Sequence, residues 1–440
     1  MSQSHRWSRS LALIVFASTL GTTIEWYDFF LYGVLTPIVL NHVFFPNLSP
    51  ALGTIAAYTT FAVGFISRPV GGIIFGHFGD RIGRKAILIV TLLIMGGGTF
   101  LIGLLPGAAT IGVAAPLLLL LLRVLQGIGI GGEWGGAVLM AIEHAPPGQR
   151  SFFGSWPQLG VPLGLMSSAG VVALLNYLPN GAFMVWGWRV AFMISALLVF
   201  VGIFVRLRIS ETPEFLQVQA EDEIVAVPVI EMIRTAPRSV ILTLGARYVE
   251  GACFNVFGVF IIAYVVNSLH LTRGFALFAV VLSSACMLPF ILIAGRLADR
   301  YGMRRVFATG ALLIAIGSVA SFALMQAYGR THNWVVLIAV VVPFSLFYPL
   351  VYGPESSLFA SQFDAKVRYT GVSFAYQVSG IYASGLTPLI ASVLLVADHG
   401  APWYVVLYMI AVGLISFGSV MAMRFEPQLQ QQPVGTVNSR

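Results

Sequence analysis

The sequence predicts an all-α polytopic membrane protein with 12 transmembrane helices in two six-helix halves. Three observations support this prediction: the composition, a series of long apolar stretches, and an internal repeat. Of the 440 residues, 58% are hydrophobic and only 9% are charged, whereas a soluble domain carries about 25% charged residues. A transmembrane helix needs about 20 apolar residues, so the chain has room for roughly a dozen. An ordinary cytosolic enzyme and a disordered, charge-rich chain are both excluded.

Twelve apolar stretches separated by short polar loops supply the expected helices. The first opens at Leu11 and continues through Tyr32, which is too long for the apolar core of a cleaved signal peptide and indicates a retained span. Long unbroken runs also favour helices over the alternating strands of a membrane barrel. The expected spans are 11–35, 52–76, 86–106, 113–138, 152–176, 187–207, 239–266, 275–295, 306–327, 334–356, 370–396 and 402–423.

The longest polar interruption divides these spans into six and six. It contains a cluster of acidic residues, including Glu221, Asp222 and Glu223, and is expected to be a solvated linker with an amphipathic helical part. The predicted organisation is a first half at 1–207, a cytoplasmic linker at 208–238, a second half at 239–424 and a cytoplasmic tail at 425–440.

The distribution of Lys and Arg predicts the orientation. With the N-terminus inside, 18 of the 24 basic residues fall on the cytoplasmic side, as the positive-inside rule requires. Only Arg189, Arg273 and Arg330 fall on the other side. We therefore expect a multi-pass protein of the cell (inner) membrane with both termini in the cytoplasm. The sequence pI of about 9.5 then reflects topology, and nucleic-acid binding is not expected.

An internal repeat supports the division into halves. The segment from Gly76 to Lys85 follows the second span, and a similar segment from Gly295 to Arg304 follows the eighth, 219 positions later. Arg150 and Arg368 begin a second pair of similar segments, each before the fifth span of its half. Repeated six-span halves are typical of secondary transporters that bind their substrate near the membrane midplane.

At these residues the chain resembles the major facilitator superfamily, and more narrowly the metabolite:proton symporter family. The loop after span two matches the signature of the superfamily, with Met303 in place of the basic residue expected in the second copy. The resemblance rests on Gly76-His-Phe-Gly-Asp80-Arg81-Ile-Gly83-Arg84-Lys85, on Glu25-Trp-Tyr-Asp28, on Arg123-x-x-Gln126-Gly127 with Glu133-Trp134, and on Lys366-Val-Arg368-Tyr-Thr-Gly371. Shikimate-type and related organic-acid carriers are most similar, chiefly in the first half. The family implies proton-coupled uptake of small metabolites, mostly carboxylates, with zwitterionic osmolytes in one branch.

Charged residues within the expected spans are the strongest functional signal. Each costs about 2.5–3.5 kcal/mol at the centre of a membrane helix, so we expect them to face one another or water along a polar pathway. These residues are Glu25, Asp28, Arg68, Arg123, Glu133, Arg247, Glu250 and Glu355.

Proton coupling is assigned to the acidic residues of the first half. Glu25 and Asp28 are three residues apart and share one helix face, and Arg123 is their expected cation. We hypothesise that Asp28 carries the coupled proton and that Arg123 releases it when substrate or proton arrives. Related proton-coupled sugar carriers pair an acid of span one with an arginine of span four. The alternative is a permanent structural ion pair. Glu25 and Glu133 are further candidates for proton coupling.

The substrate is expected to contact residues of both halves. Arg247 and Glu250 are one helical turn apart, so they either anchor a substrate carboxylate or form a self-paired structural dyad. Glu355 is expected at the cytoplasmic gate, and Arg68 is expected to be structural. The remaining substrate-binding candidates are Arg123, Tyr27, Trp134, Gln158, Asn255, Tyr352 and Gln377.

The cytoplasmic loops are expected to act as a gate. Asp80 can accept hydrogen bonds from the N-terminus of a facing helix, and the charged network would hold the cytoplasmic side closed. The alternative is that these basic residues only set topology. The gating candidates are Gly76, Asp80, Arg81, Gly83, Arg84 and Lys85 in the first half, with Asp299, Arg300 and Gly302 in the second.

No cofactor, metal site or enzymatic activity is expected. Cys253 and Cys286 lie in apolar runs without metal-binding spacing, and no phosphate-binding motif is present. The predicted function is import of a small organic acid with protons by alternating access, by a protein expected to be monomeric. The alternatives are a proline/betaine-type symporter, a sodium-coupled or drug-efflux carrier, a transporter-like receptor and a passive channel.

Overall fold

The computed structural model describes residues 9–48, 50–175, 177–178, 181–220 and 227–424, and within this part it is helical without strands. The first group of helices is α1 (Arg9–Leu35), α2 (Asn41–Phe44), α3 (Pro50–Ile82), α4 (Arg84–Leu104), α5 (Ala108–Ile111), α6 (Ala114–Glu143), α7 (Arg150–Gly154), α8 (Gly160–Leu175) and α9 (Trp188–Arg206). The second group is α12 (Pro237–Asn255), α13 (Ile261–Asn267), α14 (Arg273–Tyr301), α15 (Met303–Tyr328), α16 (Asn333–Val342), α17 (Tyr348–Ala360), α18 (Arg368–Gly380), α19 (Thr387–Ala397) and α20 (Trp403–Ala422). Between them lie α10 (Pro213–Ala220) and α11 (Pro228–Thr235).

The all-α membrane architecture is confirmed. In the described part of the chain, 10 helical segments are long and apolar enough to cross a membrane. Helices α1 and α3, which are 27 and 33 residues long, pack against α8 and α6 respectively. The arrangement is consistent with the predicted count of twelve. The predicted tail at 425–440 and the acidic residues Glu221, Asp222 and Glu223 lie outside the described residues.

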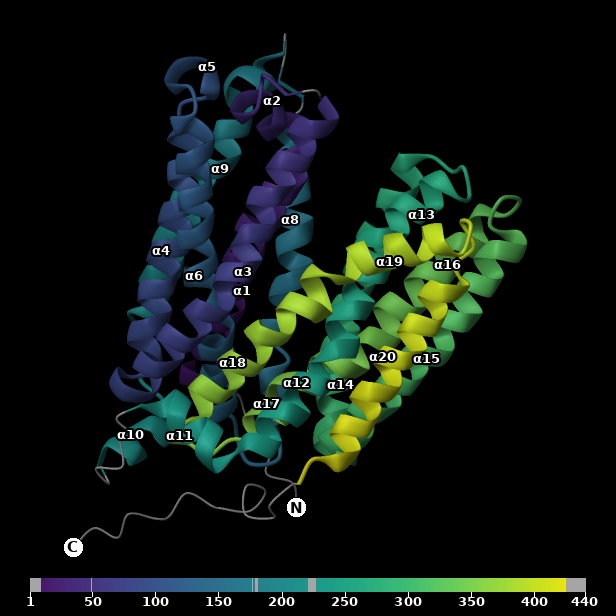
Figure 1. Cartoon of the computed structure of the whole chain (residues 1–440). Coiled ribbons are helices and arrows are strands. Elements are labelled where there is room, and N and C mark those ends of the chain that lie inside the picture. Colours follow the sequence, from purple (N-terminus) through teal and green to yellow (C-terminus); the bar gives the residue numbers. More distant parts are fainter. Residues whose placement is uncertain (1–8, 49, 176, 179–180, 221–226, 425–440) are drawn as a thin grey trace, which may run out of the picture.

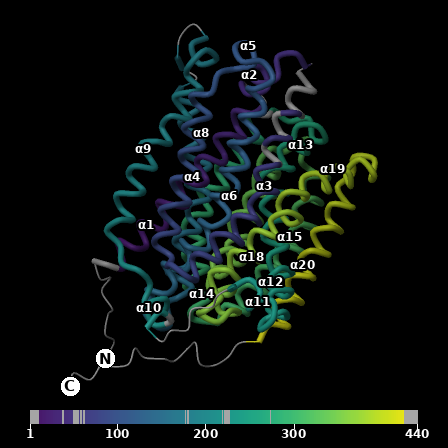
Figure 2. Tube along the Cα trace, turned by 60° about the vertical axis from the view of Figure 1, so that its left-hand side comes forward, coloured from purple at the N-terminus to yellow at the C-terminus, as the bar shows by residue number. Residues whose placement is uncertain are grey.

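The two groups of helices stand side by side and meet mainly near one end. Figure 1 shows α10 and α11 at that end, which we call the linker end, whereas the groups diverge toward the end that carries α2, α5 and α13. The turned view in Figure 2 places α10 and α11 at the same end of the bundle. The described hydrogen bonds between the groups join the linker-end halves of their helices.

Glycines allow the closest approach of helices in the first group. A Cβ atom added to Gly131 of α6 would lie 2.6 Å from the backbone nitrogen of Gly72 of α3. Because backbone cannot rotate away as a side chain can, only glycine fits where these helices cross. The Gly-rich stretch of span four therefore serves helix packing.

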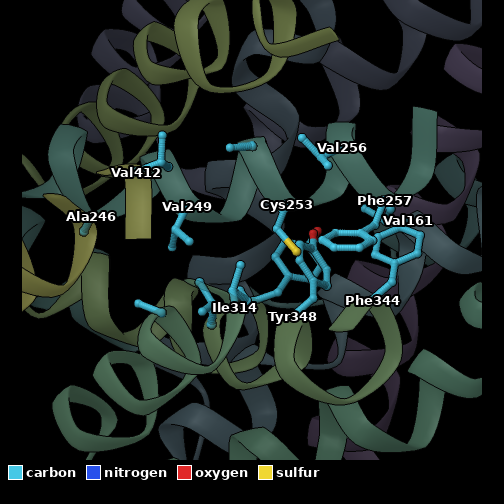
Figure 3. Close-up of a cluster of buried hydrophobic side chains, with 14 of the residues drawn as sticks. Val161, Ala246, Val249, Cys253, Val256, Phe257, Ile314, Phe344, Tyr348 and Val412 are labelled. Atoms are coloured by element: carbon cyan, nitrogen blue, oxygen red, sulfur yellow. The ribbon is translucent and has the colours of Figure 1, made fainter. Parts of the chain in front are cut away.

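A buried apolar cluster connects the two groups. It is built mainly from the second group and includes Cys253, Phe257, Phe344 and Tyr348. Figure 3 shows Val161 of α8, from the first group, lying beside Phe257 and Phe344. Single turns of π-helix interrupt the same region, at Val256–Phe260 (η4), Pro343–Phe347 (η5) and Ile381–Gly385 (η6). Such turns are frequent at functional sites because they break the regular hydrogen-bond ladder.

Candidate functional site

Asp28 lies on α1 with 1% of its surface exposed. Its Oδ1 accepts a hydrogen bond from the hydroxyl of Ser195 on α9, and its Oδ2 has no hydrogen-bond partner among the described residues. The neighbouring Tyr27 donates from its hydroxyl to the carbonyl of Ala191 at 2.8 Å. These contacts fix this face of α1 on α9, and they leave one oxygen of a buried carboxylate without a hydrogen-bond donor.

Arg123 lies buried on α6 and contacts aromatic and amide groups. Its guanidinium sits 3.9 Å from the ring centroid of Tyr32, and its Nη1 donates to Oε1 of Gln126 at 2.9 Å. Arg123 lies within electrostatic reach of Asp28, and the role of this pair in proton coupling stays a hypothesis.

Glu133 is held by a different arginine. It forms an ion pair with Arg206 at the end of α9, and both side chains are 1% exposed. The hydroxyl of Thr91 donates to Oε2 of Glu133 at 2.8 Å, and Arg206 also donates to the carbonyl of Leu88. Two buried opposite charges that are also hydrogen-bonded to their surroundings in this way are suited to joining α4, α6 and α9.

Glu25 and Arg68 lie close to the boundary between the groups. Glu25 is 3% exposed, and its Oε2 has no hydrogen-bond partner among the described residues. Glu133, Arg68 and Arg206 are within electrostatic reach of it. The guanidinium of Arg68 packs 4.5 Å from the ring centroid of Phe29 and 4.3 Å from that of Phe65, which stabilises the cation through its aromatic neighbours.

An aromatic stack crosses the boundary at the same level. The ring of Trp134 on α6 stacks on the ring of Tyr376 on α18, with centroids 3.7 Å apart and an interplanar angle of 16°. Trp134 Nε1 donates to Gln158 Oε1 at 2.9 Å, and Gln158 Nε2 donates to the carbonyl of Tyr352 at 2.9 Å. Gln377 adds a bond from its Nε2 to the carbonyl of Gly131 at 3.2 Å. Four of the expected substrate-binding residues thus meet across the boundary.

The second group supplies a cluster of charges around Arg247. This arginine, 4% exposed, forms an ion pair with Glu250, and its Nε lies 3.4 Å from Oε1 of Glu355. Its guanidinium also lies 4.0 Å from the ring centroid of Tyr376. Glu355 was expected at the cytoplasmic gate. The structure places it beside Arg247 and directly before Ser356, whose hydroxyl donates to the carbonyl of Gly154 in the first group at 3.0 Å. Asn255, about two turns beyond Arg247 on α12, donates to the carbonyl of Gly251 at 2.8 Å.

At the linker end, two aspartates bind the starts of helices in the opposite group. Asp80 accepts from the backbone nitrogen of Tyr369 at 3.2 Å and from that of Thr370 at 2.9 Å, at the start of α18. Asp299 accepts from the backbone nitrogens of Ser151 and Phe152, both at 2.8 Å, at the start of α7. The repeated sequence segments therefore make equivalent contacts in opposite directions between the groups.

A charged network surrounds the first of these aspartates. Arg84 lies 3.8 Å from Asp80 and 3.4 Å from Glu143, and Glu143 lies 3.4 Å from Arg368 of the second group. Arg368 also pairs with Glu214 of α10. Arg84, Glu143 and Arg368 are buried, and separating the groups here would break the ion pairs that Arg368 makes with Glu143 and Glu214.

The other gating candidates lie at the edges of this network. The backbone nitrogen of Lys85 donates to Glu211 Oε2 at 3.1 Å, and Arg81 lies 3.3 Å from His77 on the exposed face of α3. Arg300 is exposed beside Tyr301. Gly83 and Gly302 have φ angles of 105° and 93°, which favour glycine at these two sharp turns, and Gly76 packs against Thr370 of α18.

Comparison with known proteins identifies the family. Residues 13–244 match the family described as sugar (and other) transporters, and residues 243–437 match the major facilitator superfamily. A shikimate transporter of Escherichia coli (strain K12) is 37% identical over 420 residues, which cover 95% of this chain and 94% of the relative. The chain belongs to the metabolite:proton symporter family of the major facilitator superfamily.

Two further similarities, one to a transporter of another substrate class and one to a solved structure, accompany this family assignment. A proline/betaine transporter of Escherichia coli (strain K12) is 31% identical over 414 residues, covering 91% of this chain and 81% of the relative. The solved structure of the proton:xylose symporter XylE bound to 6-bromo-6-deoxy-D-glucose matches with a TM-score of 0.74, 18% identity, and coverage of 94% of this chain and 95% of that one. The protein is therefore a membrane transporter of small molecules and not an enzyme.

The sequence analysis missed several residues that the structure brings together. Arg206 was counted only among the basic residues on the cytoplasmic side, and the structure buries it against Glu133. Ser195, Glu143 and Tyr348 had no sequence signal, because a serine, a helix-terminal acid and a tyrosine are common in membrane spans. Their partners lie 59 to 167 positions away. Within the described residues, groups of His, Cys, Asp and Glu that could hold a metal ion are absent.

Proposed function

We propose that the protein is a proton-coupled symporter that imports a small organic acid by alternating access. The observation that carries this proposal is the placement of incompletely hydrogen-bonded charges on both sides of the boundary between the groups. Glu25 and Asp28 lie on one side, and Arg247 and Glu355 on the other. Buried ionisable groups in a membrane protein are expensive and mark the path of ions or substrates.

The two groups act as the moving halves, with the linker 208–238 between them. Their contacts near the linker end support a state that is closed at that end and open at the other. We place the linker end in the cytoplasm, with both termini, because Arg81 and Arg300 are exposed there and basic residues are retained on the cytoplasmic side. The protein then accepts substrate from outside and releases it after the gate of Asp80 and Asp299 opens.

The cargo is an organic acid such as shikimate, an aromatic hydroxy acid or a dicarboxylate. The shikimate transporter among the relatives supports this class, and Arg247 supplies a cation that suits a carboxylate. A zwitterionic osmolyte remains the second candidate, because proline/betaine transporters are also relatives. Against it, the aromatic rings of Trp26, Phe29 and Phe65 that would suit a quaternary ammonium group already enclose Arg68.

Asp28 is the proton-coupling carboxylate of the first half in this proposal. It is buried, it has one oxygen without a hydrogen bond among the described residues, and it lies within electrostatic reach of Arg123. Binding of a proton would neutralise a charge that is costly to keep in this place. The protein would work as a monomer, since each half supplies its part of the site.

The test records external pH in a lightly buffered suspension of energy-depleted cells that express the protein. Neutralised shikimate, hydroxybenzoates, dicarboxylates, citrate, proline and betaine are added one at a time. Alkalinisation by organic acids, absent in cells that express Asp28→Asn, is the expected result. A response to proline or betaine alone would assign the second class of cargo. Entry of labelled compound without any change of pH would contradict proton coupling.

A further inference from the structure

Glu355 is a buried carboxyl group at the boundary between the groups, and its chemical role in transport is not specified by the proposed function. The residue is 0% exposed on α17, and neither of its carboxyl oxygens has a hydrogen-bond partner among the described residues. Among the described residues, the cation next to Glu355 is Arg247, whose Nε lies 3.4 Å from Oε1 of Glu355. The titratable hydroxyls of Tyr348, Tyr352 and Tyr376 also face it from α17 and α18. An ionised carboxylate without hydrogen bonds is costly to bury.

Arg247 lies between two carboxylates that differ in the number and length of their polar contacts. Glu250 forms an ion pair with it and also accepts a hydrogen bond from the hydroxyl of Tyr348 at 2.6 Å. Glu355 reaches the same guanidinium only at 3.4 Å. If both acids are ionised, the cluster carries a net charge of −1. Glu250 is the better stabilised anion, so Glu355 is the group that can be neutralised at the smaller loss of interactions.

The guanidinium has one donor left open. Its Nη1 contacts Glu250, whereas its Nε makes no hydrogen bond of good geometry to a described residue, although the side chain is only 4% exposed. The face of the guanidinium is covered by the ring of Tyr376, 4.0 Å away. Its Nε is therefore the donor that is open to a carboxylate oxygen, on the side where Glu355 lies.

We propose that Glu355 is a second proton-binding carboxylate and that the carboxylate of the substrate takes its place beside Arg247. This inference rests on the proposed function and specifies how proton and anion are linked within it. One oxygen of Glu355 binds a proton from water and becomes a neutral carboxyl group. The substrate carboxylate then pairs with Arg247, while Glu250 stays ionised beside Tyr348. The net charge of the cluster is the same before and after the exchange.

Repulsion between like charges couples binding of the substrate anion to protonation of Glu355. Without the proton, three carboxylates would surround one guanidinium. Like charges this close together repel one another strongly in a buried site, so the anion would bind far more weakly. Asp28 lies in the other half and would carry its own proton. Two protons with one monoanion move a net positive charge inward, so the membrane potential would then drive uptake as well as the pH gradient.

The test counts protons taken up when substrate binds. The purified full-length protein in detergent is titrated with shikimate, and heats are compared in two buffers that differ in ionisation enthalpy. Glu355→Gln should take up about one proton fewer per bound shikimate than the unsubstituted protein, because one carboxylate has been replaced. The slope of log Kd against pH should fall by about one for the same reason. Asp364→Asn is the matched control, since Asp364 is an exposed acid outside the cluster.

Each outcome decides the proposal. Equal proton uptake by Glu355→Gln and the unsubstituted protein would overturn it, and so would complete loss of binding in a variant that mimics the neutral acid. Should Glu355→Gln fail to fold, Glu355→Met provides a second neutral side chain for the same measurement. Unsubstituted protein that binds shikimate without proton uptake would overturn this inference alone. Failure to bind or transport any organic acid would instead contradict the proposed function on which it rests.

Discussion

The indole of Trp134 lies on the phenol ring of Tyr376 with 3.7 Å between ring centroids, and the two residues belong to opposite groups of helices. The stack sits between the first-group acids and the Arg247 cluster, because the guanidinium of Arg247 also lies against the ring of Tyr376. Closer to the linker end, the groups are joined by hydrogen bonds to Asp80 and Asp299. A substrate that reaches the charged groups from the other end would meet this stack before it could pass through.

Trp134→Leu should shift the protein toward the state that is open at the linker end. The change removes the stack and the hydrogen bond to Gln158, which together stabilise the present contact by about 1–3 kcal/mol. The equilibrium between states should move by roughly 5- to 100-fold. The opening is measured by the rate at which a thiol reagent labels a Gln149→Cys side chain, because Gln149 borders the junction near Asp299. Cys253 and Cys286 are replaced by Ala in this chain.

Faster labelling of position 149 in the Trp134→Leu chain is the expected result. Trp403→Leu is the control, because Trp403 is exposed at the start of α20. Equal labelling rates in all three chains would mean that the stack does not hold the linker end closed.

Asp80→Asn should slow transport more than Asp299→Asn does. Both changes weaken charge-assisted hydrogen bonds to a helix start, each worth about 1.5–3 kcal/mol. Asp80 additionally lies 3.8 Å from Arg84, whereas the residue equivalent to Arg84 in the second half is Met303. We expect initial uptake rates to fall by about 10-fold or more for Asp80→Asn and by less for Asp299→Asn. The reverse order would show that the second-half contact is the stronger gate.

Glu133→Gln should destabilise the protein because it leaves Arg206 buried without its counter-charge. Removing one partner of a buried pair costs about 3–5 kcal/mol. The double variant Glu133→Gln with Arg206→Gln should recover most of this loss, and unfolding temperature in detergent measures it. The double variant should also keep proton-coupled uptake. Loss of coupling in a double variant of normal stability would instead assign the coupled proton to Glu133.

Asp28→Asn should abolish accumulation but keep exchange. Asparagine resembles the protonated acid and cannot release a proton, so the cycle can run only with substrate bound. Labelled substrate should then exchange with unlabelled substrate across the membrane of proteoliposomes at a rate near that of the unsubstituted protein. Concentration of substrate under an imposed pH gradient should be lost. Accumulation by Asp28→Asn would remove Asp28 from the coupling mechanism.

Local sequence patterns predicted the helices, because these depend on residues close together in the chain. They also predicted that Asp80 accepts from a facing helix start, although the start of α18 lies 289 positions away. The apolar runs located the spans, and the segment Gly76 to Lys85 identified Asp80 and its turn at Gly83. The partners of the buried charges could not be read in this way. Arg206 resembles an ordinary basic residue at a helix end, and only the packing of α9 against α4, which also packs against α6, brings it to Glu133.

Glu355 illustrates the same limit in the second half. It follows Pro354 near the end of an expected span, so the sequence favoured a place at the gate. In the structure the π-helical turn at Pro343–Phe347 precedes α17, and the residue lies beside Arg247 of α12. Such a pairing depends on the relative rotation of two helices about 100 residues apart, which a short apolar pattern does not specify.

Gly131→Ala should destabilise the first group of helices, whereas Gly97→Ala should not. A Cβ atom at position 131 would lie 2.6 Å from the backbone nitrogen of Gly72 and 2.8 Å from the carbonyl carbon of Gly71, so α3 and α6 would have to separate. Overpacking of this kind costs about 1–3 kcal/mol. At Gly97 of α4 nothing lies within 4 Å of the added atom, and alanine there gains up to about 1 kcal/mol from its helix propensity. Unfolding temperatures of the two variants in the same detergent compare them, and similar values would show that the α3–α6 contact tolerates a wider spacing.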